Sequence, residues 1–331
     1  MKRVRLAVLG TAHVHLADHL DVVAADRHTE LAAVHRGSGP WPPRLAGVRP
    51  ATADEALAGA DAALVASTTA EHGPLLRRVA AAGLPVLVEK PLAGSAAQTA
   101  ELLAVLASGG RPATTAMFLR CAPAFGRLRA LLAARAFGEL ASVEAGFSHP
   151  GLPDGLFDGP AGWMLDAAHG PAGAFADLAV HLVDLLGWLA PGAGLRVLGA
   201  VLRHRPGLAA DVGGAALLSW GGVPVSVRAG WASRPGGVSV RVEGERGTAR
   251  VDGGRLTLTG AGERVEEYPP PRAGAALEGF LAGLRGERRW AAPTCAEILR
   301  GARVMDAIGR RTSQSLIDPA PSTPQPACHP K

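Results

Sequence analysis

Short apolar runs alternate with amphipathic stretches over the first third of the chain. The runs are rich in Val, Leu and Ala, as in buried strands, and the longer stretches repeat apolar residues with helical spacing. The expected strands are Val4–Leu9, Leu31–His35, Ala62–Ser67, Pro85–Glu89 and Thr114–Phe118. The expected helices are Val14–Ala25, Pro74–Ala82, with Pro74 as its first residue, and Ala96–Ser108, preceded by a capping box at Ser95–Gln98. This order predicts an α/β fold with a doubly wound parallel sheet.

Beyond residue 190 apolar and polar residues alternate one by one. Val225, Val227, Ala229 and Trp231 share one face of such a segment, which predicts a half-buried, mostly antiparallel sheet. The dipeptide Asp252-Gly253 predicts a hairpin turn within it. Helical spacing returns at Ala275–Leu284 and Cys295–Arg310. We therefore expect a first domain over residues 1–120, a second α+β domain over 121–317 whose closing helix near 294–310 packs back on the first, and a Pro-rich, disordered tail over 318–331.

Composition narrows the class of protein. The chain has 331 residues, 48% of them hydrophobic and 19% charged, which suits a soluble protein with two cores. The net charge of +5 comes from arginines scattered singly, so we expect no nucleic-acid partner. The longest uncharged apolar stretch is too short and too rich in Gly to cross a membrane. Cys121, Cys295 and Cys328 form no C-x-x-C pair, which favours a reducing, cytoplasmic location without disulfides or structural zinc.

The first expected strand leads into the turn Gly10-Thr11-Ala12-His13-Val14-His15. A dinucleotide-binding turn needs glycines for its tight bend and for close approach of the pyrophosphate to backbone amides. Only the first glycine of G-x-G-x-x-G is present, since Ala12 and His15 stand at the other two positions. The turn therefore indicates a dinucleotide site, or an ordinary strand-to-helix turn of another α/β fold.

Polar residues also follow the next strands. Arg36 stands where an NAD enzyme usually has an acidic residue, which favours NADP unless the arginine is merely solvated. Ser67, Thr68 and His72 follow a third strand and could contact a nicotinamide ribose or cap the next helix. Because the carboxyl ends of parallel strands meet at one crevice, these side chains belong to one candidate site.

Glu89-Lys90-Pro91 ends another strand at the same crevice. Lys90 is the one lysine between Lys2 and Lys331, in a chain that otherwise uses arginine. A partly desolvated lysine can donate to a substrate hydroxyl or transfer a proton. A surface lysine at a strand end is the alternative interpretation.

Asp177, His181 and Asp184 are spaced to share one face of a helix. A lone histidine in so apolar a helix is usually a core residue, but two acids on its own face favour the wall of a polar cleft. No further His or Cys has supporting spacing, so we expect no metal.

Together these residues resemble the glucose-fructose oxidoreductase, inositol dehydrogenase and MocA (Gfo/Idh/MocA) family of oxidoreductases, from about Val4 to about Ile317. The resemblance implies a Rossmann domain followed by a domain whose open sheet serves homo-oligomerisation. It implies that Lys90 contacts both the nicotinamide and the reacting hydroxyl, with His181 as acid or base and Asp177 fixing the substrate. Arg120 and Trp163 match positions that line the substrate pocket. The candidate cofactor residues are Gly10, Thr11, Ala12, His13, Arg36, Ser67, Thr68, His72, Glu89 and Lys90.

We therefore expect an NAD(P)-dependent oxidoreductase that moves a hydride between nicotinamide and a carbinol or carbonyl carbon of a sugar, cyclitol or related polyhydroxy compound, with NADP slightly favoured over NAD. His181 is the expected acid or base and Lys90 the electrostatic partner of the oxygen, although the reverse assignment is possible. Two alternatives remain. The altered glycine turn suits an inactive ligand-binding scaffold or sensor, and a hydrolase or lyase that recycles its cofactor would use the same residues.

Overall fold

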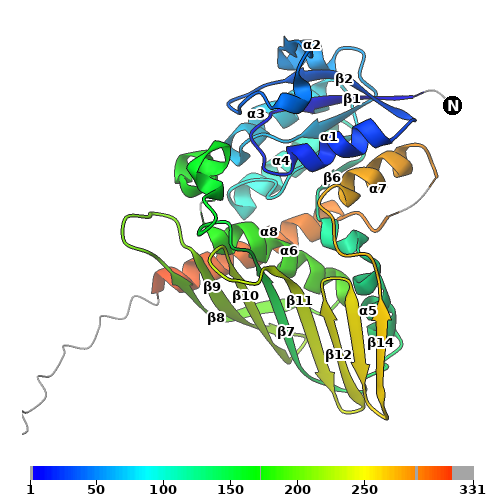
Figure 1. Ribbon diagram of the computed structural model, residues 1–331, viewed down its shortest axis with the longest axis vertical. Helices are drawn as coiled ribbons and strands as arrows, with labels where there is room; N and C mark the ends of the chain where they lie inside the picture. Colours follow the sequence, from blue (N-terminus) through cyan, green and yellow to red (C-terminus); the bar gives the residue numbers. More distant parts are fainter. Residues whose placement is uncertain (1–2, 172, 288–289, 315–331) are drawn as a thin grey trace, which may run out of the picture.

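A six-stranded parallel sheet forms the first domain of the computed structural model, which describes residues 3–171, 173–287 and 290–314 (Figure 1). Its strand order is β3-β2-β1-β4-β5-β6. The strands are β1 (Val4–Leu9), β2 (Thr29–His35), β3 (Pro50–Ala51), β4 (Ala62–Val65), β5 (Val86–Val88) and β6 (Ala113–Thr115). The helices between them are α1 (Leu16–Ala25), α2 (Ala53–Leu57), α3 (Thr69–Ala81) and α4 (Ala96–Ser108).

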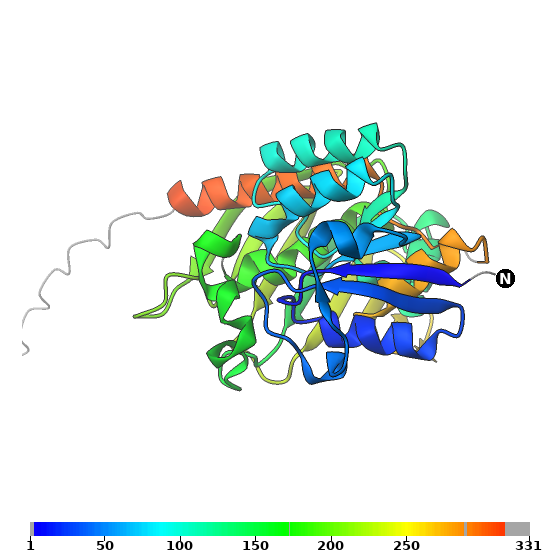
Figure 2. The same ribbon diagram turned by 90° about the horizontal axis from the view of Figure 1, so that it is seen from above.

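Alternate residues of β1 pack into two different cores. Leu6 and Val8 belong to the core beneath α1, whereas Ala7 and Leu9 belong to the core beneath α2, α3 and α4. Helices thus cover both faces of the sheet, as the apolar strands predict (Figure 2). The doubly wound α/β architecture is confirmed.

The second domain is built on an eight-stranded sheet of order β14-β13-β12-β11-β7-β10-β9-β8. Its strands are β7 (Leu140–Ser148), β8 (Leu195–Arg203), β9 (Gly213–Trp220), β10 (Val223–Gly230), β11 (Gly237–Gly244), β12 (Gly247–Asp252), β13 (Arg255–Thr259) and β14 (Glu263–Glu267). The pair β7–β10 is parallel and the other pairs are antiparallel, so the expectation of a mostly antiparallel sheet is confirmed. Helices cover one face and leave the other open (Figure 1).

Four helices belong to this second domain. They are α5 (Pro123–Ala133), α6 (Ala174–Leu189), α7 (Ala275–Leu284) and α8 (Cys295–Gln314). Helix α6 packs on β7, β9 and β10, α7 contacts α1, and α8 contacts α4, α6, β6 and β8. Five 3₁₀ helices complete the described elements, namely η1 (Pro43–Leu45), η2 (Phe118–Cys121), η3 (Leu156–Asp158), η4 (Pro160–Leu165) and η5 (Ala167–His169). Because α6 lies between the second sheet and the first domain, its polar face can meet the end of β5.

The helix expected to begin at Pro74 begins instead at Thr69, so that prediction is wrong. Thr68 is its N-cap residue and Glu71 binds back to the Thr68 amide, which favours a start before the proline. Pro74 therefore lies inside α3. The tail expected over 318–331, with Cys328, lies outside the described residues. Within the described ranges, no helix has the length and apolar character needed to cross a bilayer.

Candidate active site

Gly10 occupies a bend that another residue could not. Its φ is +92°, and a Cβ there would lie 2.3 Å from the Cβ of Ser67 on the neighbouring strand end. The next residues approach the start of α1, and the amides of Ala12 and Val14 donate no hydrogen bond within the described residues. Free amides before a helix bind phosphate oxygens, so this turn fits the pyrophosphate of a dinucleotide.

Two segments from elsewhere in the chain lie against the turn. Thr11 donates its hydroxyl to the carbonyls of Arg36, at 3.0 Å, and Pro40, at 2.6 Å. A Cβ on Gly39 would lie 2.4 Å from the Ala12 nitrogen, so only glycine fits there. From the second domain, Trp163 donates its indole N–H to the Ala12 carbonyl at 2.9 Å. The structure thus places Trp163, expected in the substrate pocket, directly on the glycine turn.

Glu89 is buried, and its carboxylate lies against two histidines. Its carboxylate lies 2.6 Å from Nε2 of His19 and 3.4 Å from Nε2 of His13, and it accepts the Lys90 amide at 3.1 Å. Burial alone would raise the pKa of Glu89, but the two imidazoles hold it well below its ordinary value. Burial lowers the pKa of His13 to about 3. The His15 amide donates to Nδ1 of His13, so Nε2 of a neutral His13 carries the proton toward Glu89. This carboxylate joins the glycine turn to the strand end that carries Lys90.

Lys90 and Asp177 form a buried ion pair between β5 and α6. The Lys90 ammonium donates to Oδ1 of Asp177 and, at 3.3 Å, to its backbone carbonyl. Trp231 donates its indole N–H to Oδ2 at 3.0 Å. Burial would raise the pKa of Asp177, but the charge of Lys90 and these hydrogen bonds lower it to about 2. Asp177 is therefore an anion that holds the Lys90 ammonium at the crevice.

His181 lies one helical turn beyond Asp177, with 1% of its surface exposed. Its ring packs edge-on against Phe118, with centroids 4.8 Å apart, and lies 5.9 Å from Phe147. Burial lowers the pKa of His181 well below its ordinary value, and the charge of Lys90 adds to this effect. Its buried Nδ1 has no hydrogen-bond partner within the described residues. A neutral imidazole with an orphaned nitrogen beside an ion pair can exchange a proton with a bound oxygen.

The residues after β4 act mainly through local structure. Thr68 donates its amide and hydroxyl to Glu71, at 3.3 and 3.0 Å, so of the two predicted roles the structure shows the cap. The Ser67 hydroxyl donates to the Thr68 carbonyl at 3.1 Å. His72 is buried, and its Nδ1 lies 3.1 Å from the carbonyl of Leu92. That contact holds the segment that follows Lys90.

Arg120 was expected to line the substrate pocket, but its guanidinium is bound elsewhere. It donates to both carboxylate oxygens of Asp184 at 2.7 Å and lies 3.4 Å from a carboxylate oxygen of Glu297. Asp184 shares a helix face with Asp177, yet the two acids have different partners. The contacts of Arg120 with Asp184 and Glu297 therefore link η2 to α6 and α8. They are separate from the contacts of the Lys90–Asp177 pair.

Phe118, Phe147 and Trp231 surround the site without having been proposed as site residues. Trp231 was expected only as one member of a buried sheet face. No local pattern marks these aromatic residues as neighbours of His181 or Asp177, because η2, β7 and the residue after β10 meet only in the folded chain.

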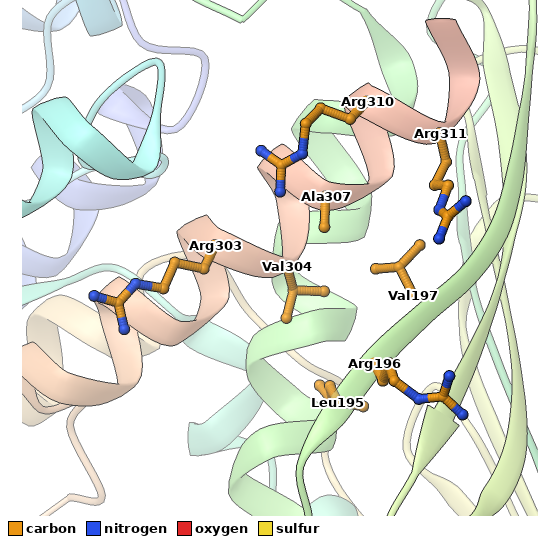
Figure 3. A pocket seen from close by; sticks show the side chains of 8 residues that line it. All are labelled: Leu195, Arg196, Val197, Arg303, Val304, Ala307, Arg310 and Arg311. Atoms are coloured by element: carbon orange, nitrogen blue, oxygen red, sulfur yellow. The ribbon is translucent and has the colours of Figure 1, made fainter. Parts of the chain in front are cut away.

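A separate hollow of about 500 Å³ between α8 and β8 is lined by four arginines, Arg196, Arg303, Arg310 and Arg311 (Figure 3). None of them forms an ion pair with another described residue. Arg303 and Arg310 point to one side of α8 and Arg311 to the other, so the charges do not converge on one point (Figure 3). The part of the chain that the structure describes contains no group of three or more His, Cys, Asp or Glu side chains that could hold a metal ion.

Comparison with known proteins agrees with this geometry. Residues 4–116 match the oxidoreductase family with an NAD-binding Rossmann fold, and residues 125–250 match the Gfo/Idh/MocA C-terminal domain. A dTDP-3,4-didehydro-2,6-dideoxy-α-D-glucose 3-reductase from Streptomyces violaceoruber is 30% identical, over 93% of this chain and 95% of the relative.

Solved structures show the same fold. An inositol dehydrogenase homologue from Azotobacter vinelandii, solved with NAD+, superposes with a TM-score of 0.81 at 17% identity, covering 95% of this chain and 96% of the other. The 3-ketoreductase KijD10 from Actinomadura kijaniata, solved with NADP and TDP-benzene, superposes with a TM-score of 0.77 at 24% identity, covering 94% and 98%. The chain therefore belongs to the Gfo/Idh/MocA family and is an NAD(P)-binding oxidoreductase.

Proposed function

We propose that this protein transfers a hydride between a nicotinamide cofactor and a carbinol or carbonyl carbon of a sugar, cyclitol or related polyhydroxy compound. The observation that carries the proposal is the Lys90–Asp177 ion pair beside the orphaned Nδ1 of His181, at the end of β5. The name of the Streptomyces relative, a reductase of a dideoxy-sugar nucleotide, supports a sugar-like substrate. Nicotinamide, when bound, supplies or accepts the hydride.

The chain's own residues must then handle the proton and the substrate oxygen. An alkoxide would be costly in a site this buried, so proton transfer accompanies hydride transfer. Neutral His181 suits acceptance of a hydroxyl proton during oxidation, while the Lys90 ammonium polarises the same oxygen. In the reverse assignment Lys90 moves the proton and His181 donates a hydrogen bond. Asp177 keeps Lys90 in place and can accept from a second substrate hydroxyl.

For the cofactor we propose NADP over NAD. Arg36 follows β2, the position that faces the adenosine ribose in Rossmann domains. Its Nε donates to the carbonyl of Gly39 at 2.8 Å, and its other two nitrogens donate no hydrogen bond within the described residues. Those nitrogens are available to a 2′-phosphate.

A second candidate function is a ligand-binding scaffold without turnover. The specific observation that favours it is the close packing of Gly39 on the nitrogen of Ala12, one of the two amides proposed to bind pyrophosphate. This candidate function requires Gly39 to remain packed on the Ala12 amide. It predicts that the protein binds no nicotinamide dinucleotide.

We also propose a homo-oligomer formed through the open face of the eight-stranded sheet. Exposed apolar side chains support this, since Val201 on β8 is 62% exposed and Leu217 on the neighbouring β9 is 48% exposed. In sedimentation velocity we expect the parent to sediment as an oligomer and Leu217→Glu to shift toward monomer. A monomeric parent would contradict the proposal.

The decisive experiment begins with titration of the purified protein with NADPH, NADP, NADH and NAD, following nicotinamide fluorescence and thermal shift. The expected result is binding with a preference for the NADP forms that is lost in Arg36→Ala. A screen of sugars and cyclitols with the bound cofactor then seeks a change in nicotinamide absorbance. Binding by none of the four would favour the scaffold. Product formation with a mass shift of water and no net absorbance change would identify a cofactor-recycling hydrolase or lyase.

A further inference from the structure

Glu71, in the first turn of α3, reaches over the glycine turn to the loop that follows β2. Its Oε1 accepts the Ser38 amide at 2.9 Å and its Oε2 accepts the Ser38 hydroxyl at 2.9 Å. Strands β2 and β4 flank β1 in the sheet, so this contact bridges two strand ends across the one that carries Gly10. The carboxylate therefore lies at the rim of the proposed cofactor site.

The two loops together hold Glu71 in a cradle of hydrogen-bond donors. Besides Ser38, the amide and hydroxyl of Thr68 donate to Oε2, at 3.3 and 3.0 Å. Gly37 has a φ of +62°, and a Cβ there would come within 3.0 Å of Oε1. Converging amide and hydroxyl donors are the ordinary means by which proteins bind anions, and here the anion is internal.

Helix capping accounts for only half of these bonds. Helix α2 has the same type of cap, in which Glu55 accepts the Thr52 amide at 2.7 Å and donates its own amide to the Thr52 hydroxyl at 3.2 Å. Among the described residues, that carboxylate has no hydrogen bond to a distant loop. The Thr68 bonds of Glu71 are thus explained by the cap, whereas its bonds to Ser38 need another explanation.

The position of Ser38 supplies one. It lies two residues beyond Arg36, in the segment that meets the 2′-position of an adenosine ribose in Rossmann domains. A 2′-phosphate placed near Arg36 would draw on the same serine amide and hydroxyl that Glu71 already occupies. It would also experience repulsion from the carboxylate, because like charges a few ångströms apart disfavour each other.

We propose that Glu71 is a specificity-determining residue of the cofactor site, acting against the arginine at the end of β2. It occupies the Ser38 donors with an internal anion and limits the preference for a 2′-phosphate that Arg36 confers. A free 2′-hydroxyl carries no charge and is not repelled. The inference rests on the proposed function, because it needs a dinucleotide in this crevice.

The test compares adenosine 2′,5′-bisphosphate with adenosine 5′-monophosphate, which differ only in the 2′-phosphate. Calorimetric titration of the full chain gives the ratio of their dissociation constants, and fluorescence titration with NADPH and NADH repeats it for whole cofactors. In Glu71→Gln the amide can still accept from Thr68, but the charge is gone. We expect the ratio to move toward the 2′-phosphate ligands by about tenfold, or about 1.4 kcal/mol. Glu55→Gln, the matched cap on α2, should leave the ratio unchanged.

Ser38→Ala tests whether the charge of Glu71 or the position of the loop that carries Ser38 sets the ratio. It removes one bond to Glu71 but keeps the carboxylate, so the ratio should not move toward the 2′-phosphate ligands. A rise equal to that of Glu71→Gln would overturn the proposal, as would an unchanged or opposite ratio in Glu71→Gln. If Glu71→Gln fails to fold, a rise in Ser38→Ala still overturns the proposal and a constant or falling ratio supports it.

The outcomes also separate this inference from the function on which it rests. If the parent binds NADH and NADPH while Glu71→Gln keeps their ratio, only the role of Glu71 fails. If the parent binds neither cofactor and neither adenosine ligand, the proposed function fails and this inference fails with it.

Discussion

Helix α6 carries two buried carboxylates on one face, and they have opposite character. Asp177 binds the flexible Lys90 ammonium and the Trp231 indole, next to a histidine whose Nδ1 has no partner among the described residues. Asp184, two turns further on, binds both prongs of the Arg120 guanidinium. The first group is able to rearrange around a ligand, whereas the second is saturated by a rigid, two-pronged pair.

The protonation behaviour of the two acids differs in the same sense. Burial raises the pKa of each, but at Asp177 the Lys90 charge and its hydrogen bonds prevail and the pKa falls to about 2. At Asp184 burial prevails over Arg120, the nearby Glu297 adds to it, and the pKa is raised. In α6, therefore, the ion pair that marks the candidate site is the one with polar atoms beside it that remain free to bind a ligand.

Loss of Lys90 or His181, the neighbours of Asp177, should have the largest effect, which is on turnover. Lys90→Ala or His181→Ala is expected to lower turnover of the best sugar or cyclitol substrate by about 10²–10⁴, the usual contribution of one acid–base group. Steady-state rates over a range of pH measure this, and circular dichroism checks the fold. Arg120→Lys, which keeps the charge of the Arg120–Asp184 pair, serves as the control with much smaller kinetic change. Turnover within a few-fold of the parent in both alanine variants would refute the assignment.

Breaking the Arg120–Asp184 pair should instead destabilise the protein. Arg120→Ala leaves Asp184 buried without its partner, which typically lowers the free energy of unfolding by about 3–5 kcal/mol. Urea unfolding followed by tryptophan fluorescence measures it. The double variant Arg120→Met with Asp184→Leu should recover much of the loss, since neither charge of the buried pair then remains. A loss below about 1 kcal/mol in Arg120→Ala would show that the pair is dispensable.

A smaller effect is expected at the indole that orients Asp177. Trp231→Phe keeps most of the aromatic packing but removes the hydrogen bond to Oδ2, so the free energy of unfolding should fall by about 1.5–3 kcal/mol. The pKa of Asp177 should rise because one donor to its anion is gone. Equal stability of parent and variant would mean that water replaces the indole without loss. Trp41→Phe, which removes a neutral bond to a backbone carbonyl, is the control with the smaller change.

The smallest effect is on the pH dependence of the free energy of unfolding, to which the two acids should contribute in opposite directions. The pKa of Asp177 is lowered on folding from its ordinary value of 3.8 to about 2, so its stabilisation is present above pH 3.8 and is lost as the pH falls toward 2. The pKa of Asp184 is raised, so its contribution is most favourable below 3.8 and is lost as the pH rises through the folded value. Urea unfolding of the parent, Asp177→Asn and Asp184→Asn between pH 2 and 7 should show differences of opposite slope. Parallel slopes would contradict the comparison.

Part of this site could be predicted from local sequence. Lys90 stood out as an internal lysine after an apolar strand, and Asp177 and His181 by their spacing on one helical face. The burial of Glu89 against two histidines could not be predicted, because these partners lie 70 and more residues away. Nor could the separation of Asp184 from Asp177, since both acids have the same periodicity.

Sequence alone predicted many of the elements and their order, but not α2, α5 or β7. Strand β1 and helices α4 and α7 have the predicted bounds, because apolar periodicity and turn residues act over a few positions. The tertiary structure decided which charges meet. Lys90 and Asp177 lie 87 residues apart, and Arg120 and Asp184 lie 64 apart. Such pairs depend on which side chains lose water together when the two domains pack, and desolvation is a property of the folded surroundings that no local pattern contains.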